Sequence, residues 1–308
     1  MVTLGPLTPH STAPNSYNDT RGRPPLKHQA QRYLSLDIFN LKLRSVLFVD
    51  PFRKLDLINF RNKFQHIYVL QLEIQSGTKL PDSIGSLYHL KFLRLKGIHE
   101  FPSSIGNLKN LQTLCVFNDH RQLCQLPPET ADLINLRHLV VDYSKPLKHI
   151  SKLTSLQLLS GLSCDQWRDV NPVDLVNLGE LRVFDIAKTY SMNNIGNLKH
   201  LHTLFLGCKY KSFPPLEFLI SCHMLHKLWL NGRIEKLPPP DTFPYSITMM
   251  ILWDSKLIED PMPILGMLPN LRYLDLVAAY EGKEISCSDN KFGQLEFLHL
   301  DSLWNLER

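Results

Sequence analysis

LPDSIGSLYHLKFLRLKG, at residues 80–97, is followed almost at once by FPSSIGNLKNLQTLCVFN, at residues 101–118. The leucines of the two stretches occupy the same places, whereas most other positions differ. Both stretches fit the pattern L-x-x-L-x-x-L-x-L, with Val116 in the last place of the second. The closing L-x-L has the two-residue period of a β-strand, so both anchors face one side and their neighbours face the other.

The same pattern continues along the chain as a repeat. With the penultimate anchor as a register mark, we identify twelve units that are about 23 residues apart, inside the 20–29-residue range of leucine-rich repeats. The marks are Val46, Leu70, Leu93, Leu114, Leu139, Leu159, Phe184, Leu204, Leu228, Met250, Leu274 and Leu298. The units at Val46 and Leu159 are weak, and Gly161 replaces the final anchor of the latter.

A single unit cannot bury its own leucines, so consecutive units must stack. The sequence therefore predicts an α/β leucine-rich-repeat solenoid, a horseshoe with short parallel strands on the concave face and an irregular or short-helical convex side. The returning segments carry proline, which lacks an N–H donor and suits an unpaired convex segment. Gly85, Gly106 and Gly196 recur after isoleucine, and we expect them to permit a tight turn that a Cβ would obstruct.

Composition limits the classes of partner and compartment. The net charge of +5 is mild, and part of it lies in the first 45 residues, which we interpret as a solvated tail with no nucleic-acid partner. The six cysteines form no CxxC pair, which favours a reducing compartment. We find no signal peptide and no run of 18 apolar residues, and we predict a cytoplasmic protein without a membrane span.

The chain divides into three predicted parts. We expect a disordered tail over residues 1–28, an N-terminal cap and first degenerate repeat over residues 29–66, and the leucine-rich-repeat domain over residues 67–308.

The variable positions beside the strand anchors are predicted to lie on the concave face. Toward the N-terminal end they are charged and mixed, as with Arg94 and Lys96. Toward the C-terminal end they turn apolar and aromatic, with Phe205, Trp229, Met249, Ile251, Trp253, Tyr273 and Phe297. Aromatic side chains clustered on an exposed surface are typical of binding hot spots, so we predict that these nine residues bind protein. The alternative is that the register slips in irregular units and that some of these side chains belong to the core.

Motifs for catalysis and metal binding are absent from the sequence. EGKEI at residues 281–285 lacks the first glycine and the Ser/Thr of a phosphate loop, and neither H-E-x-x-H nor G-x-S-x-G occurs. Cys115, His120 and Cys124 lie close together without zinc-like spacing, and we interpret them as a loop histidine and core cysteines. We therefore predict no enzyme, no cofactor and no metal.

Four of the repeats read LPDSIGSLYHLKFLRLKG, FPSSIGNLKNLQTL, LPPETADLINLRHLVV and IGNLKHLHTLFLG. They resemble the repeats of plant intracellular disease-resistance receptors of the coiled-coil, nucleotide-binding, leucine-rich-repeat class. RYLSL at residue 32, LRSVLFV at 43 and FQHIYVLQLE at 64 are similar to the segment that joins the nucleotide-binding module to the repeats, and LEFLHLDSLWNLER at 295 is similar to late repeats. The resemblance covers residues 32–308.

The resemblance implies a role in plant innate immunity. In that family the repeats sense pathogen effectors or guarded host proteins and restrain a nucleotide-binding switch, in cis or in trans. The chain departs from the family in lacking the nucleotide-binding module, so it is not expected to bind ADP or ATP by that route. It also ends just after a strand without a polar cap, which we interpret as a fragment, a truncated gene model, or a product that needs a partner.

A second departure concerns the Asn or Cys ladder that usually follows the strand. Only Asn118 and Cys208 come close to it, which predicts irregular curvature. Two other functions stay open at this point. One is an intracellular leucine-rich-repeat scaffold for a signalling kinase or phosphatase. The other is a hydrolase or nucleotide-dependent enzyme, against which the missing motifs argue.

Overall fold

The computed structural model describes part of the chain. The described residues are 43–50, 64, 66–118, 125–142, 147, 149–163, 170–186, 188–189, 191–288 and 291–307. All described residues belong to the compact unit Lys42–Arg308. The predicted tail at residues 1–28 and most of the predicted cap at 29–66 lie outside the described residues.

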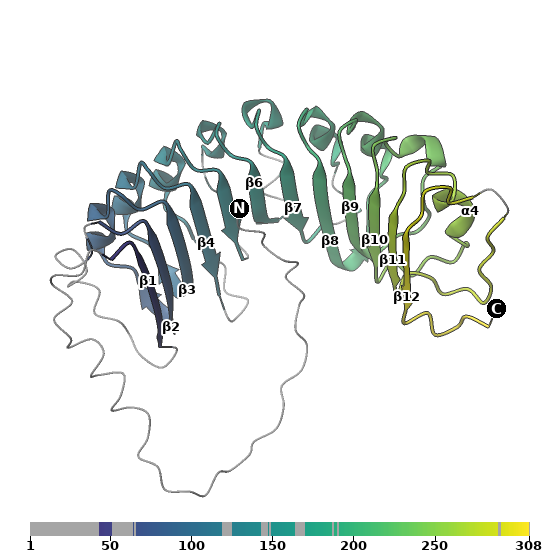
Figure 1. Ribbon diagram of the computed structural model, residues 1–308, viewed down its shortest axis with the longest axis horizontal. Helices are drawn as coiled ribbons and strands as arrows, with labels where there is room; N and C mark the ends of the chain where they lie inside the picture. Colours follow the sequence, from purple (N-terminus) through teal and green to yellow (C-terminus); the bar gives the residue numbers. More distant parts are fainter. Residues whose placement is uncertain are drawn as a thin grey trace, which may run out of the picture. The chain divides into compact units, whose positions relative to one another are not determined.

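One sheet of twelve parallel strands organises this unit, and its strand order follows the chain from β1 to β12 (Figure 1). The strands are β1 (Ser45–Asp50), β2 (Val69–Lys79), β3 (Phe92–Glu100), β4 (Thr113–Phe117), β5 (His138–Val141), β6 (Leu158–Ser163), β7 (Glu180–Phe184), β8 (Thr203–Ser212), β9 (Lys227–Arg233), β10 (Met249–Trp253), β11 (Tyr273–Val277) and β12 (Phe297–Asp301). Consecutive strands pair in parallel with the leucine anchors aligned, as in Leu70↔Leu93 and Leu204↔Leu228.

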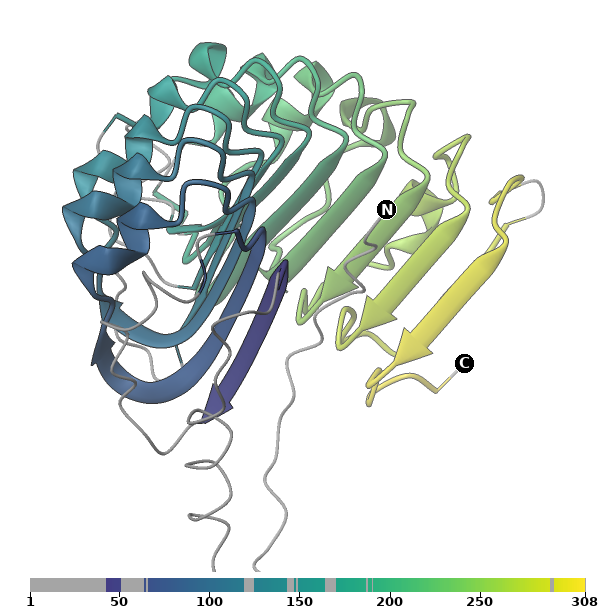
Figure 2. The same ribbon diagram turned by 60° about the vertical axis from the view of Figure 1, so that its left-hand side comes forward.

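Short 3-10 helices return the chain between strands. They are η3 (Asp82–Ser86), η4 (Ser103–Asn107), η5 (Pro128–Asp132), η6 (Ile150–Lys152), η7 (Pro172–Asp174), η8 (Asn193–Asn197), η9 (Glu217–Ser221) and η10 (Pro240–Thr242), joined by one α-helical turn, α4 (Met262–Leu265). The strands line the concave side of the curved sheet and these helices its convex side (Figures 1 and 2). The predicted leucine-rich-repeat solenoid with a short-helical convex side is confirmed.

The core is a stack of aliphatic anchors. Leu70, Leu93, Leu114 and Leu204 are completely buried, as the repeat pattern requires. Burial of a leucine side chain stabilises a fold by roughly 1.5–3 kcal/mol, so the stack accounts for most of the cohesion between coils. β12 differs, because Leu298 and Leu300 on it are 44% and 39% exposed.

The predicted register is wrong in one unit. In β7 the residue that pairs with Leu204 is Leu181, not Phe184. Leu181 and Val183 are buried, whereas Phe184 is half-buried on the opposite face of the strand. The true anchors of this unit are Leu175, Leu178, Leu181 and Val183. Two overlapping matches to the pattern compete here, and the fold uses the one whose anchors are all aliphatic, since a phenyl ring overfills a leucine-sized slot.

The weak unit in β6 contains a β-bulge. The pairing with β7 shifts between Ser160 and Leu162, so Leu162 takes the place of the missing final anchor and is 4% exposed. Gly161 is the extra residue, with φ 99°. A Cβ at this position would overlap the carbonyl oxygen of Val141, so only glycine accommodates the insertion.

The recurring Ile-Gly glycines are explained by the spacing between coils. A Cβ on Gly106 would lie 2.9 Å from the carbonyl oxygen of Glu129, and one on Gly196 would lie 2.8 Å from Cβ of Ser221. Both contacts are to the next coil, so these glycines let neighbouring convex turns approach each other closely. The expectation that a Cβ would obstruct the turn holds, with the next coil as the obstacle.

An asparagine ladder ties neighbouring coils together at the L-x-N-L step before the strand. Each side-chain amide donates a 2.8 Å hydrogen bond to a backbone carbonyl of the preceding coil. The pairs are Asn110 to Tyr88, Asn135 to Lys109, Asn177 to Thr154 and Asn270 to Tyr245. We expected such a ladder only after the strand, near Asn118 and Cys208, so this ladder before the strand was not predicted.

Candidate protein-binding surface

Side chains between the buried anchors project from the concave side, because neighbours on a strand point to opposite faces. The parallel register aligns them into rows that cross the strands. The middle row contains Gln71, Arg94, Cys115, Val140, Ser160, Arg182, Phe205, Trp229, Ile251, Asp275 and His299. In β9–β12 the first row contains Lys227, Met249, Tyr273 and Phe297, and the third row contains Asn231, Trp253, Val277 and Asp301.

The N-terminal part of the concave side carries charged side chains that interact with their own neighbours. Lys96 Nζ lies 2.7 Å from Glu73 Oε1 on the adjacent strand. The Arg94 guanidinium lies 5.0 Å from the ring centroid of Phe117, in a cation–π contact. Both Lys96 and Arg94 are thus engaged within β2–β4.

The same self-pairing extends to β5 and β7. Thr113 Oγ1 lies 2.9 Å from His138 Nδ1, and Arg182 Nη2 lies 2.6 Å from Glu180 Oε1. Burial lowers the pKa of His138, Arg137 lowers it further, and Glu180 partly opposes them. His138 is therefore held preferentially in its neutral form.

The C-terminal part carries a continuous chain of ring contacts, here called the aromatic chain: Phe184, Phe205, Trp229 and Trp253. Ring centroids are 5.0 Å apart between Phe184 and Phe205, 4.9 Å between Phe205 and Trp229, and 4.6 Å between Trp229 and Trp253. The last two contacts are edge-to-face, an arrangement that aromatic quadrupoles favour. Four neighbouring strands, β7–β10, thus hold one connected aromatic surface.

A second ring pair continues the surface onto β11 and β12. Tyr273 and Phe297 stack with centroids 4.5 Å apart and an interplanar angle of 7°. Burial raises the pKa of Tyr273, and the charge of Asp275 raises it further. Tyr273 therefore stays a neutral phenol, and its ring extends the apolar area toward β12.

Exposure varies among these side chains. Phe205 is only 9% exposed, because Phe184 and Trp229 cover it, whereas Phe297 is 46% exposed. Trp229 and Trp253 are half-buried, and the Nε1 atom of each is buried without a hydrogen-bond partner. An unpaired buried donor lowers the stability of a fold by roughly 1–3 kcal/mol, so a ring without an N–H group would be more stable at these positions.

The structure brings together seven of the nine predicted site residues, all on β8–β12. Arg94 and Lys96 lie on β3 instead and do not adjoin the aromatic chain. Phe184 was missed because its unit was assigned the wrong register. Asp275 and His299 were also missed, although their places between the anchors of β11 and β12 carry the same signal. His299 Nδ1 lies 3.0 Å from Asp275 Oδ1.

Four of the six cysteines lie in the described part of the chain. Cys115, Cys208 and Cys222 are buried and Cys287 is exposed. Burial raises the pKa of the Cys115 and Cys222 thiols to about 11, so both stay protonated and unreactive. His120 and Cys124, interpreted with Cys115 from the sequence, lie outside the described residues.

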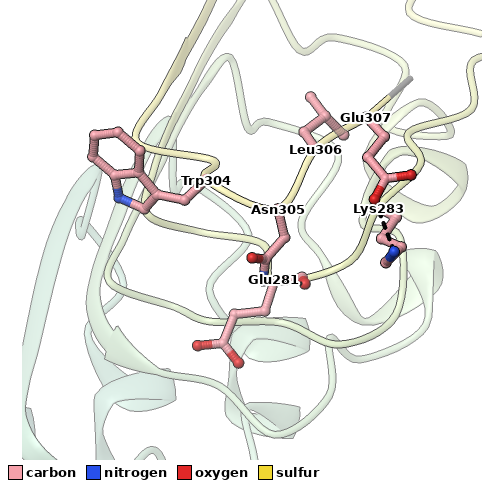
Figure 3. Close-up of a pocket in the computed structure, with 6 residues that line it drawn as sticks. All are labelled: Glu281, Lys283, Trp304, Asn305, Leu306 and Glu307. Atoms are coloured by element: carbon pink, nitrogen blue, oxygen red, sulfur yellow. Dashed lines mark hydrogen bonds and ion pairs between the residues drawn. The ribbon is translucent and has the colours of Figure 1, made fainter.

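A shallow hollow of about 440 Å³ lies away from the rows, in the segments that follow β11 and β12 (Figure 3). It is lined by Glu281, Lys283, Trp304, Asn305, Leu306 and Glu307. Its polar groups form an ion pair and a hydrogen bond with one another. Lys283 Nζ lies 2.8 Å from Glu307 Oε1, and the side-chain amide of Asn305 donates to the carbonyl of Glu281 at 2.9 Å. These contacts are typical of coil stacking.

No group of three or more His, Cys, Asp or Glu residues in the described part of the chain is arranged to hold a metal ion. Among the described helices, none combines the length and the apolar character needed to cross a membrane.

Comparison with known proteins places the chain in a family context. A family model described as a leucine-rich repeat region matches residues 42–307. The disease resistance protein RPH8A of Arabidopsis thaliana is 31% identical over 290 residues, which cover 87% of this chain and 31% of that protein. The probable disease resistance protein At1g59620 of the same plant is 30% identical over 290 residues, covering 86% of this chain and 32% of that protein. This chain spans about a third of the length of these relatives.

A solved structure supports the fold. The internalin InlF of Listeria monocytogenes superposes with a TM-score of 0.58 at 15% identity, covering 86% of this chain and 85% of that chain. At this identity the likeness extends to the fold alone.

Proposed function

The chain belongs to the leucine-rich-repeat region family that matches residues 42–307, and on that premise we propose that it is a non-catalytic protein-recognition and regulatory domain in plant defence. Its partner is a pathogen effector, a guarded host protein or the nucleotide-binding module of a receptor. The names of the curated Arabidopsis relatives, which are disease resistance proteins, support the assignment to defence. The recognition is proposed to occur in the cytoplasm, where buried thiols such as those of Cys115 and Cys222 stay reduced.

The aromatic chain is the observation that carries the proposal. Large rings on a concave sheet, rimmed by polar residues, supply the contact area on which protein–protein affinity concentrates. The unpaired indole N–H groups of Trp229 and Trp253 add to this reading. A phenylalanine would present an aromatic ring at either position without an unsatisfied donor, so packing alone does not account for tryptophan at two neighbouring positions.

Binding is therefore assigned to β7–β12, with Trp229 and Trp253 at the centre. Central, well-packed aromatic side chains contribute most to an interface, whereas the surrounding contacts mainly exclude water. Arg94 and Lys96 form a separate candidate patch on β3. Arg94 already contacts Phe117, and Lys96 already forms an ion pair with Glu73. A contribution from that patch would come through additional contacts with a large partner.

The test is the double variant Trp229→Ala/Trp253→Ala in a leaf cell-death assay. The chain is expressed beside a matched receptor, and its effect on cell death, triggering or dampening, is scored. The matched control is Tyr245→Ala/Trp304→Ala, which removes two aromatic side chains that are 80% and 88% exposed and lie outside the concave rows. The first variant should lose the effect, and the control should keep it.

Thermal melting separates loss of binding from loss of fold. Both double variants should melt near the wild-type temperature. A large drop in melting temperature for the tryptophan variant alone would place the two side chains in the core. Loss of the cell-death effect in the control as well would show that the loss is not specific to the aromatic chain. Recovery of a kinase or phosphatase from uninfected tissue would instead favour the scaffold function.

A further inference from the structure

We infer that the segment bound by the concave face presents a basic side chain, a lysine or arginine flanked by apolar residues, to the surface formed by Trp253, Asp275 and Asp301. This inference rests on the proposed function and adds the chemistry of the partner. It follows from the juxtaposition of aromatic rings with Asp275 and Asp301, which form no ion pair with a lysine or arginine among the described residues.

The charge on this surface is opposite to that of the whole protein. The chain has a net charge of +5. Strands β10, β11 and β12 nevertheless contain no lysine or arginine, whereas β11 and β12 contain Asp275 and Asp301. Asp254 follows β10 directly. The C-terminal end of the concave side is therefore locally acidic.

Asp275 is a buried acid within the middle row. It is 6% exposed, and its register partners are Ile251 on one side and His299 on the other. Its Oδ1 lies 3.0 Å from Nδ1 of His299, which can donate a hydrogen bond to it in the Nδ1–H tautomer. Burial raises the pKa of Tyr273, and the charge of Asp275 raises it further, because a charge with few water molecules around it acts strongly on its surroundings.

Asp301 and Asp254 extend the acidic region into the third row. Both are exposed, and neither forms an ion pair with another described residue. The side chain of Asp301 accepts one hydrogen bond, at 3.3 Å, from Ser302 Oγ. Since adjacent strands are about 4.8 Å apart, Trp253 on β10 and the carboxylates on β11 and β12 lie within about 10 Å of one another. One long basic side chain can contact all three.

Two lysines bound this acidic region. Lys227 begins the first row on β9, and Lys256 follows Asp254 by two residues; both are exposed. Lys227 lies on β9, away from the two aspartates, whereas the backbone N–H of Lys256 donates to Ala278, which directly follows β11. Neither lysine forms an ion pair with Asp275 or Asp301. A partner cation is therefore expected beside these two aspartates and not along the whole aromatic chain.

The chemistry of the surface favours a cation over an anion. The face of an indole ring is negative and attracts ammonium and guanidinium groups by roughly 0.5–2 kcal/mol. The apolar stem of lysine or arginine can lie on the rings while its charged end meets the carboxylates. A glutamate or aspartate of a partner would instead be desolvated beside like charges, which opposes binding.

The experiment selects displayed random peptides on the full-length chain and then measures individual affinities by fluorescence polarisation. Peptides are kept if Trp229→Ala/Trp253→Ala weakens them, and their composition is compared with the unselected library. Lysine or arginine beside an apolar residue should be enriched. Asp275→Asn should then weaken binding about tenfold, and Asp301→Asn about threefold. The control Asp241→Asn, on an exposed residue of η10 on the convex side, should leave affinity unchanged.

A charge swap keeps the test decisive if Asp275→Asn fails to fold. Asp301→Lys changes an exposed residue, and it should weaken a basic peptide while strengthening the same peptide with each basic residue replaced by glutamate. Tryptophan-dependent peptides without basic enrichment, or equal binding to both aspartate variants and wild type, would overturn the inference and leave the proposed function standing. Absence of any tryptophan-dependent peptide would remove the support for both.

Discussion

The two parts of the concave side are built on the same leucine core but use their variable positions differently. In β2–β7 charged side chains satisfy one another, as Glu73 does with Lys96 and Glu180 with Arg182. In β8–β12 rings contact rings, and Asp301 has no cationic partner among the described residues. The charged side chains Glu73, Lys96, Arg94, Glu180 and Arg182 of the first part all contact neighbours within it, whereas Asp301 of the second part contacts no cation.

This difference indicates which part of the concave side can contribute most to the free energy of binding a partner. A charge that already has an ion-pair partner offers little to a ligand, because forming a new contact breaks the old one and desolvates both groups. Half-buried rings, and carboxylates without a lysine or arginine partner, can instead form new favourable contacts with a bound protein without breaking existing ones. A repeat array can therefore keep one uniform core and still concentrate recognition at one end.

The largest effect should come from breaking the core that both parts share. Leu114→Ala removes a completely buried anchor in β4, and we expect a loss of about 2–5 kcal/mol in the free energy of unfolding, measured by denaturant titration. Leu298→Ala changes the equivalent anchor of β12, which is 44% exposed, and should cost less than about 1 kcal/mol. Equal losses would show that β12 is packed as tightly as β4.

Most of the solenoid could be predicted from sequence because its cause is local and periodic. The spacing of aliphatic residues determines which side of each strand is buried, and eleven of the twelve register marks are correct. The exception shows where periodicity alone does not determine the register. In LVNLGELRVFDI the pattern fits at two offsets, and only packing decides that Val183 and not Phe184 enters the core.

The candidate surface was predictable in outline but not in its contacts. The alternation of side chains along a strand places Trp229 and Trp253 on the concave side. Their rings, 4.6 Å apart, nevertheless belong to the middle and the third row, and the repeat pattern does not predict a contact between rows. The compensation of Lys96 by Glu73 depends on the neighbouring strand in the same way. Burial of Phe205 beneath its neighbours was equally invisible, since it depends on how far Phe184 and Trp229 lean over it.

A smaller effect should follow from opening the ion pair that typifies the polar part. The side chains of Lys96 and Glu73 are 35% and 39% exposed, so solvent screens them and their coupling should be about 0.2–1 kcal/mol. A double-mutant cycle with Glu73→Gln and Lys96→Met measures it by denaturant titration. The coupling should shrink as salt is added. A coupling that is large and insensitive to salt would mean that the pair behaves as a buried one and that the polar part is more rigid than its exposure indicates.

The smallest expected effect is a pH dependence specific to the polar part. Because burial and Arg137 lower the pKa of His138, the unfolded chain binds a proton at a higher pH than the folded chain does. The stability contributed by neutral His138 is therefore complete above the unfolded pKa of 6.5 and is lost as the pH falls toward the folded pKa.

Denaturant titrations between about pH 7.5 and pH 5.5 test this sign. His138→Gln should lose less stability than wild type on acidification, and Arg137→Gln should lie between them, because it removes one of the two causes. Asp142, whose pKa burial raises, acts in the opposite direction, but all three proteins contain it and its contribution cancels in the differences. Identical pH profiles for wild type and His138→Gln would show that the imidazole titrates as freely in the folded protein as in the unfolded chain. In that case the 2.9 Å contact between Thr113 Oγ1 and His138 Nδ1 would not restrict protonation of the imidazole. The side chain of His138 would then be more open to solvent than this contact indicates.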